Sequence, residues 1–329
     1  MGRRSLDTNK KNISYLAGIA VAIILPLVIR LTGAYWAHIL ILIGIYAILA
    51  TSLNLIMGYT GQADLAHSAL YGVGAYTSGI IAIRFGINFW ITLPIAGLVA
   101  VAIGSILGLI TLRLRGTYFA LACSAFLFLM SMVFTNLRNL TGGIQGLLFI
   151  PSASIGGFVI HQKDKIIWTY IVFAVLLLTI FVVDRVVHSR VGRALIAIRE
   201  DEDLAKSTGV NTFWYKMIAF VVATFFAGVS GALFATYNGM VTPANFDIIL
   251  FFMIVAACFI GGLGTLLGPV IGAVIVVLLP EILRVTGQYY FVIFGVFIIA
   301  ATLFAPDGVI GLVTKARKKL ARRQQKAVD

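Results

Sequence analysis

The chain has 329 residues, of which 60% are hydrophobic and 11% are charged, against roughly 45–50% and about 25% in soluble domains. This composition excludes a soluble globular domain, because long uninterrupted apolar blocks are typical of helices that lie in a bilayer. The formal net charge of +13 does not indicate a nucleic-acid-binding protein, since Lys and Arg lie at the ends of apolar segments, as in membrane proteins.

The apolar runs predict an all-α integral membrane protein with about ten transmembrane helices, because roughly 20 apolar residues cross the hydrocarbon layer. The runs fall at residues 13–31, 36–57, 71–84, 89–112, 117–135, 166–187, 213–237, 249–260, 265–283 and 288–305. The third and eighth runs are short, so we expect broken or tilted helices that include neighbouring glycines. The predicted number of helices stays open between about nine and eleven.

The distribution of Lys and Arg predicts that both termini are cytoplasmic. Most of the 25 basic residues fall in or near an N-terminal tail (1–12), an inner loop (188–212) and a C-terminal tail (306–329). Another polar segment, residues 136–165, then falls on the extracytoplasmic side and is rich in Gly, which favours turns. We therefore expect one transmembrane domain over residues 1–329, with its two long loops on opposite sides.

The inner loop contains the sequence GRALIAIREDEDLAKSTGV, which predicts a short amphipathic helix over residues 193–208. At helical spacing, one stripe collects Ala194, Ala197, Ile198, Leu204, Ala205 and Thr208. Gly209 follows, and glycine accepts the left-handed conformation that closes a helix. Such a helix between two spans can present its charged face to a soluble partner, although a solvated connecting loop is the alternative.

The inner loop also carries a family signature. ABC import permeases share a cytoplasmic E-A-A-x-x-x-G motif, which Asp203, Leu204, Ala205 and Gly209 resemble with two conservative departures. Five other stretches resemble the LivM type of branched-chain amino acid permease in the same order. They are GYTGQADLAHSALYGVGAYT (58–77), RLRGTYFAL (113–121), LTGGIQGL (140–147), GGLGTLLGPVIGA (261–273) and PDG (306–308).

The resemblance implies a permease subunit of an ABC importer that moves branched-chain amino acids across the inner (cytoplasmic) membrane. It implies a LivH-like second permease, two LivG/LivF-like ATPase subunits and an extracytoplasmic amino-acid-binding protein. The chain would then be no enzyme and bind no cofactor, because ATP and Mg belong to the ATPase subunits; it contains no Gly-x-x-x-x-Gly-Lys-Ser/Thr loop. The residues implied in coupling to the ATPases are Arg199, Glu200, Asp201, Glu202, Asp203, Leu204, Ala205 and Gly209.

Two Gly-rich segments are candidates for the translocation path, because transporters place broken helices along it and ionisable groups are costly in a bilayer. The candidate residues are Gly61, Gln62, Asp64, His67, Gly262 and Gly264. Helix packing is the alternative for the glycines, and Asp64 at a helix end also suits a cap. Gly74 and Gly272 each begin a Gly-Ala step after these segments, which suggests a parallel internal repeat.

Two other functions stay open. A related ABC permease would import urea, amides or another small polar solute, and an ion-coupled secondary transporter would use Asp64 and His67. The inner helix distinguishes the classes, since a secondary transporter needs no docking helix. No metal site is expected, because Cys123 and Cys258 lie inside apolar runs without ligand spacing and suit packed thiols.

Overall fold

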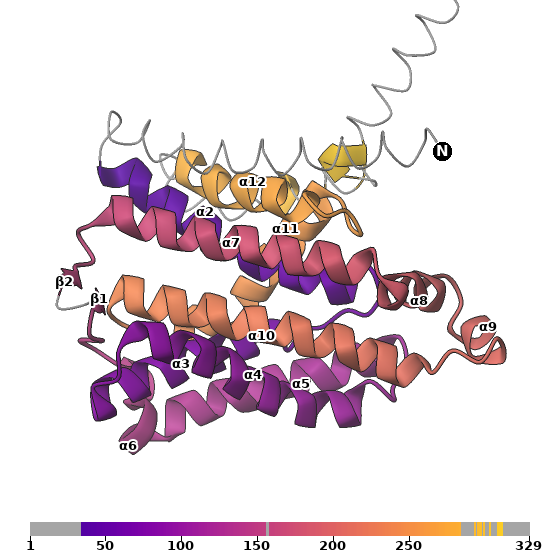
Figure 1. The fold of residues 1–329 in the computed structure, drawn as a ribbon, viewed down its shortest axis with the longest axis horizontal. Helices are drawn as coiled ribbons and strands as arrows, with labels where there is room; N and C mark the ends of the chain where they lie inside the picture. Colours follow the sequence, from indigo (N-terminus) through magenta and orange to yellow (C-terminus); the bar gives the residue numbers. More distant parts are fainter. Residues whose placement is uncertain are drawn as a thin grey trace, which may run out of the picture.

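The computed structural model describes residues 34–155 and 158–283, together with a few positions between 293 and 311 (Figure 1). The predicted run at 13–31 lies outside these residues, and most of the run at 288–305 does as well. The total of about ten helices therefore stays a prediction.

Six segments of the described chain are long and apolar enough to cross a membrane. They are α2 (Ala34–Met57), α4 (Phe89–Thr111), α5 (Thr117–Asn136), α7 (Lys165–Val187), α10 (Thr212–Asn238) and α11 (Ile248–Gly261), the last taken with the 3-10 turn η2 (Pro243–Phe246) before it. Each begins and ends close to the ends of a predicted apolar run. An apolar run can cross lipid as a helix because a helix satisfies its own backbone hydrogen bonds. The predicted multi-pass helical membrane protein is confirmed.

Two further helices complete the described bundle. α12 (Gly268–Leu283) is apolar but has only 16 residues. For the third run a broken or tilted helix was expected, and α3 (His67–Phe85) is continuous over 19 residues, so the short run does not mark a break. The apolar run underestimated its length because α3 begins with polar residues, His67 and Ser68, that are nevertheless fully buried.

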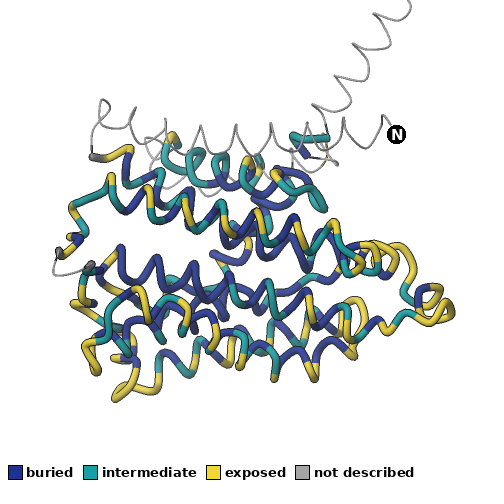
Figure 2. Tube along the Cα trace, in the orientation of Figure 1, coloured by how far each residue is buried: buried dark blue, intermediate teal, exposed yellow. Residues whose placement is uncertain are grey.

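α2 and α10 form the centre of the bundle. Their apolar stretches are 83% and 78% buried, whereas those of α4 and α5 are 33% and 28% buried. α10 packs on α2, α3 and α4, while α2 also packs on α7 and α12. Figure 2 shows the same pattern, with the outer helices alternating between buried and exposed residues. The outer helices therefore present apolar side chains outward, as expected next to lipid.

The central helices approach closely because glycines line their crossings. A Cβ added at Gly74 of α3 would overlap the backbone of Gly228 in α10, and one at Gly231 would overlap the carbonyl oxygen of Tyr71. Small residues permit such contacts between membrane helices, which associate through packing rather than by expelling water. These glycines therefore fix the distance between α3 and α10.

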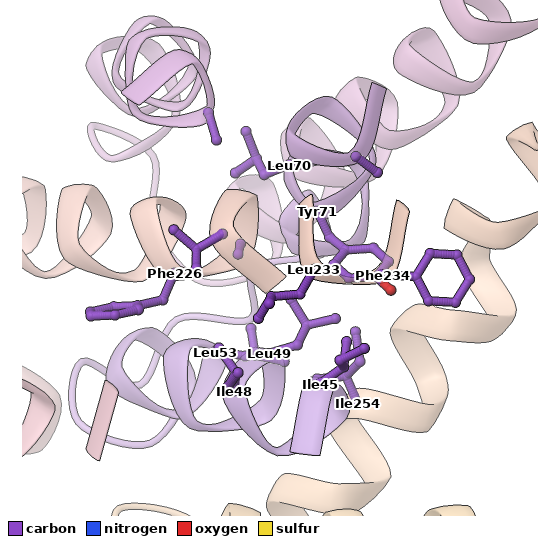
Figure 3. Packing of buried hydrophobic residues seen from close by; sticks show 14 of the residues in the cluster. Ile45, Ile48, Leu49, Leu53, Leu70, Tyr71, Phe226, Leu233, Phe234 and Ile254 are labelled. Carbon is purple, nitrogen blue, oxygen red and sulfur yellow. The ribbon is translucent and has the colours of Figure 1, made fainter. Parts of the chain in front are cut away.

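Large apolar side chains fill the space between the central helices (Figure 3). The cluster contains Ile45, Ile48, Leu49 and Leu53 from α2, Leu70 and Tyr71 from α3, Phe226, Leu233 and Phe234 from α10, and Ile254 from α11. Because these contacts join two helices near the beginning of the chain to two helices more than 120 residues later, the bundle is one packed unit over the described residues.

The two long polar segments lie at opposite ends of the bundle (Figure 1). One end carries α6 (Arg138–Thr141), the 3-10 turn η1 (Gly143–Gln145) and an antiparallel pair of strands, β1 (Ala153–Ile155) and β2 (Phe158–Ile160). The other end carries α8 (Arg190–Glu200) and α9 (Glu202–Ser207).

Candidate functional site

The inner loop folds as two helices, so the prediction of one helix over residues 193–208 is wrong. Asp201 separates α8 from α9 in an extended conformation (φ −156°, ψ 110°). Its carboxylate accepts hydrogen bonds from the backbone N–H groups of Asp203 and Leu204 at 2.9 and 3.0 Å. Asp is a strong N-cap residue, and it therefore begins a new helix within a sequence that has continuous helical periodicity.

The break at Asp201 changes which side chains are buried. Ile198 and Ala205 of the predicted stripe are buried, as is Leu195 outside it, whereas Leu204 of the predicted stripe is 62% exposed. α9 does not continue the face of α8 because the extended residue between them reorients it. Leu204 is therefore an apolar side chain presented to the outside of the loop.

Gly209 closes α9 as predicted. It has a left-handed conformation (φ 85°), and its N–H bonds the carbonyl of Lys206 at 3.0 Å. The N–H of Val210 reaches the carbonyl of Ala205 at 3.1 Å, so two C-terminal carbonyls of the short helix are satisfied.

Glu202 ties α9 to the start of α10. Its carboxylate accepts hydrogen bonds from Lys216 at 2.7 Å and from Thr212 at 3.2 Å, and it pairs with Lys206 at 3.0 Å. Partial burial of Glu202 favours the neutral carboxyl, but hydrogen bonds from Lys216 and Lys206 outweigh it and hold the pKa below its ordinary value. Glu202 therefore stays ionised and fixes the position of α9.

A second ion pair joins α9 to the turn between α4 and α5. Arg115 contacts the two carboxylate oxygens of Asp203 at 2.8 and 2.9 Å. The hydrogen bond from Arg115 lowers the pKa of Asp203. Both side chains are exposed, so the pair contributes little stability but restricts orientation. Arg115 lies in the stretch RLRGTYFAL, which resembled the permease family without a predicted role.

Arg199 connects α8 to the two Gly-rich segments. Its Nη1 donates a hydrogen bond to the carbonyl oxygen of Gly58 at 2.5 Å. A Cβ added at Gly264 would lie 2.9 Å from Nη1, and one at Gly61 would lie 3.2 Å from Cγ of the same arginine. The Arg199 side chain therefore lies between the loop after α2 and the loop after α11, and glycine makes room for it in both.

Asn54 joins the same two loops from within α2. Its Oδ1 accepts a hydrogen bond from the Gly264 N–H at 2.9 Å, and its Nδ2 donates to the carbonyl oxygen of Thr265 at 2.9 Å. Sequence reasoning missed this residue, because an Asn inside an apolar run has no local signal for a partner more than 200 positions away. Asn54 and Arg199 together hold the Gly-rich segments against each other.

Asp64 and His67 lie in a fully buried polar chain. The Ser52 hydroxyl and His67 Nε2 are 2.8 Å apart, and His67 Nδ1 lies 3.3 Å from the Asp64 carboxylate. That carboxylate also accepts the N–H of Ala66 at 3.1 Å in the turn before α3, but Asp64 does not cap the helix, whose N-cap residue is Ala66. The order resembles a nucleophilic triad, but none of the three side chains is exposed, so no substrate reaches it. These hydrogen-bonded side chains join the end of α2 to the start of α3.

The other predicted path residues divide between these two clusters. Gln62 is buried, and its Oε1 has no hydrogen-bond partner among the described residues. Gly262 begins the loop after α11 with a positive φ of 118°. Asp64 and His67 form the buried chain, whereas Gly61 and Gly264 contact Arg199.

Comparison with known proteins identifies the family. Residues 35–302 match the family described as the permease component of the branched-chain amino acid transport system. The chain belongs to this permease family. The match covers most of the chain, and the predicted resemblance to LivM-type permeases is confirmed.

Relatives in this permease family carry two related names. The chain is 29% identical to the high-affinity branched-chain amino acid transport system permease protein LivM of Salmonella typhimurium, over 97% of the chain and 79% of the relative. It is 31% identical to LivM of Escherichia coli K12, over 84% and 70% respectively. The LivH permease of Escherichia coli K12 is 27% identical, over 81% of the chain and 91% of LivH.

Proposed function

We propose that this permease is the LivM-type subunit of an ATP-driven importer for branched-chain amino acids in the inner (cytoplasmic) membrane. It acts beside a LivH-like permease, two LivG/LivF-like ATPases and an extracytoplasmic amino-acid-binding protein. The hydrogen bond between Arg199 and Gly58 carries the proposal, because it links the loop of the family signature to the transmembrane bundle.

The α8–α9 loop supplies the docking surface for an ATPase subunit. The docking face is α9 together with the residues just before it, whose exposed members include Arg199, Glu200, Asp201, Asp203 and Leu204, so Leu204 is the apolar contact of this face among charges. Salt bridges through Asp203 and Glu202 fix α9 before any partner binds. A fixed docking helix loses less conformational entropy on association than a flexible loop.

Movement of the docking surface reaches the bundle through α8. This helix packs on both α7 and α10, and Arg199 extends from it to the loops after α2 and α11. Displacement of α8 by the ATPases therefore changes the distance between those loops. ATP and Mg bind in the partner subunits, which supply the chemical step.

The predicted path lies next to this connection. Gly61, Gln62, Asp64 and His67 follow α2, and Gly262 and Gly264 follow α11. The burial of Asp64 and His67 fits a route that is closed at this end until α8 moves. The loop carrying α8 and α9 is cytoplasmic, as are both termini, and β1 and β2 lie on the extracytoplasmic side.

The test is reconstitution of the complex with its ATPases and binding protein, with uptake of radiolabelled leucine, isoleucine, valine and urea. We expect ATP-dependent uptake of the three amino acids. We expect Leu204→Asp to abolish co-purification of the ATPases, whereas Ile196→Asp, an exposed apolar residue of α8, is the matched control that separates α9 docking from general surface disruption. Uptake of urea alone would contradict the proposed substrate. Uptake that persists after deletion of residues 200–209 would contradict the proposed coupling of this loop to the ATPases.

A further inference from the structure

The segment between η1 and β1 is held to the end of α10 at two points. Leu147 exchanges two backbone hydrogen bonds with Val241, at 2.8 and 2.9 Å. The N–H of Ile150 donates to the carbonyl oxygen of Gly239 at 2.9 Å. A Cβ added at Gly79 of α3 would lie 2.9 Å from Leu147 Cδ1 and 3.1 Å from Ile150 Cδ1. Residues 147 and 150 are therefore fixed against both α3 and the loop after α10.

The two residues between these fixed points project from the surface. Leu148 is 46% exposed, and Phe149 is 91% exposed. Phe149 has a left-handed conformation (φ 57°), and among the described residues it is the only one other than glycine with a positive φ. An aromatic L residue is strained in this conformation, which persists because its neighbours are fixed. The fold therefore holds a large aromatic ring outside its core, at a cost to its own stability.

Cations and a further apolar side chain lie on the same loop. Ile144 of η1 is 75% exposed. Arg138 of α6 lies against η1, since a Cβ added at Gly143 would lie 3.1 Å from Arg138 Cγ. Arg84, in the last turn of α3, donates a hydrogen bond to the carbonyl oxygen of Asn139 in α6. Both arginines are exposed. We call these five residues the outer patch: Arg84, Arg138, Ile144, Leu148 and Phe149.

The charge of the outer patch is positive and is not balanced within the loop. The sequence contains no Asp or Glu between residues 65 and 163. Two carboxylates at this end of the bundle, Asp164 and Asp247, accept hydrogen bonds from backbone N–H groups. Neither Arg84 nor Arg138 belongs to an ion pair of the described chain. The outer patch is therefore complementary to an acidic surface with an apolar hollow.

The position of the fixed points favours a soluble protein over lipid as the occupant. They lie on α3 and at the end of α10, and the apolar stretch of α10 is 78% buried inside the bundle. The helices with the most exposed apolar stretches are α4 and α5, at 33% and 28% buried. α6 and β1 lie at the end of the bundle opposite α8 and α9 (Figure 1). Phe149 therefore projects from the end of a central helix, where a partner outside the membrane can reach it.

We propose that the outer patch docks the extracytoplasmic amino-acid-binding protein, with Phe149 inserted in an apolar hollow that acidic side chains of that protein surround. The proposal rests on the proposed function, because it names the surface on which this permease receives its cargo. Aromatic and arginine side chains commonly carry the affinity of an interface, and a ring that is already fixed loses little conformational entropy on association. The strain at Phe149 is maintained for binding rather than for folding.

The test is the affinity of the leucine-loaded binding protein for the complete permease–ATPase complex in nanodiscs. Phe149→Asp should lower this affinity at least about tenfold, as for loss of an aromatic anchor. Val159→Asp, at an exposed apolar position of β2 at the same end of the bundle, should change it less than about twofold. The ATPases should co-purify equally with both variants. Equal loss of affinity in the two variants would overturn the role of Phe149.

Two smaller replacements separate binding from folding. Phe149→Gly and Phe149→Ala both remove the ring, so both should weaken docking at least about tenfold. Only glycine adopts a positive φ without strain, so Phe149→Gly should unfold at a higher temperature than Phe149→Ala. A variant pair that differs in unfolding temperature but docks as tightly as the wild type would overturn the proposal. Arg138→Glu should also weaken docking and reduce its dependence on salt, and unchanged docking would remove Arg138 from the interface.

A photoreactive side chain identifies what covers the ring. With benzoylphenylalanine in place of Phe149, we expect light-induced cross-links to the binding protein. Cross-links only to lipid or only to the second permease would overturn the proposed partner. A wild-type complex that imports leucine, with Phe149 variants that dock normally, would overturn the outer patch while the proposed function stands. A wild-type complex that neither docks the binding protein nor imports any aliphatic amino acid would overturn the proposed function itself.

Discussion

Arg199 donates a hydrogen bond to the carbonyl oxygen of Gly58 at 2.5 Å, although the two residues are 141 positions apart. The donor lies in the loop that carries the family signature, and the acceptor lies where α2 leaves the bundle. The contact thus connects the proposed ATPase-docking surface to the end of a membrane helix.

Replacement of Arg199 should uncouple transport from ATP hydrolysis. We expect Arg199→Ala to lower leucine uptake at least about tenfold, since a hydrogen bond from a charged group contributes about 1.5–3 kcal/mol. The ATPases should still co-purify, because Leu204 and the Glu202 contacts stay in place. Arg199→Lys should recover only part of the uptake, because lysine lacks the planar guanidinium that reaches both loops. Full uptake in Arg199→Ala would contradict the proposed transmission.

The crowding around Gly264 predicts a position-specific loss of stability. Gly264 and Gly209 both have positive φ angles, of 70° and 85°. A Cβ at Gly264 would meet Arg199 at 2.9 Å, whereas nothing lies within 4 Å of one at Gly209. Both alanine variants carry the backbone cost of about 1–2 kcal/mol, but only Gly264→Ala should also displace Arg199. In detergent, the unfolding temperature of Gly264→Ala should therefore be lower than that of Gly209→Ala. Equal unfolding temperatures would refute the steric argument.

The buried polar chain predicts a different pair of variants. Ser52→Ala leaves His67 Nε2 without its partner at 2.8 Å, and an unsatisfied buried group costs about 1–3 kcal/mol. Ser124→Ala is the matched control, because both serines donate to the carbonyl three residues earlier but Ser124 is only partly buried, whereas Ser52 is fully buried. We expect a lower unfolding temperature for Ser52→Ala only. Equal unfolding temperatures for both variants would mean that the His67 contact contributes nothing.

The position of α9 should depend on pH through Glu202. The pKa of its carboxyl lies below the ordinary value of 4.5, so its contribution is fully present above that pH and is lost as the pH falls through the folded-state pKa. Amide hydrogen-exchange protection of α9, measured from pH 7 down to pH 3.5, should fall at the acidic end. Glu202→Gln should show low protection throughout and little pH dependence. A wild-type profile that matches this variant would contradict the role of Glu202.

The transmembrane helices of the described chain were predictable because apolar length is a local property. The start of α2 and the end of α7 lie within two residues of their predicted positions. The division of the inner loop into two helices was harder to predict. Its helical periodicity of apolar residues continues through Asp201, and only the N-cap preference of Asp signals the break. The predicted coupling residues did lie together, but their partners Arg115 and Lys216 come from other segments.

Other parts of the candidate sites depend on tertiary contacts that no local pattern encodes. Asn54 is one polar residue in an apolar run, and its importance emerges only when α11 and α12 pack beside α2. Phe149 lies in a short apolar stretch, and only the tertiary pairing of Leu147 with Val241 places its ring at the surface. The internal repeat stays a prediction, although the two Gly-rich segments proposed for it do contact each other.

The long-range bonds of α2 also constrain the order in which the protein matures. Asn54 leaves the ribosome 211 residues before Thr265, its hydrogen-bond partner, an interval of roughly 10–40 s at usual rates of synthesis. During that time the amide of Asn54 needs water, lipid headgroups or the insertion machinery as temporary partners. Chains that end before Gly264 would keep the Asn54 amide without its partners, which gives cellular quality control a physical means of recognising an incomplete permease.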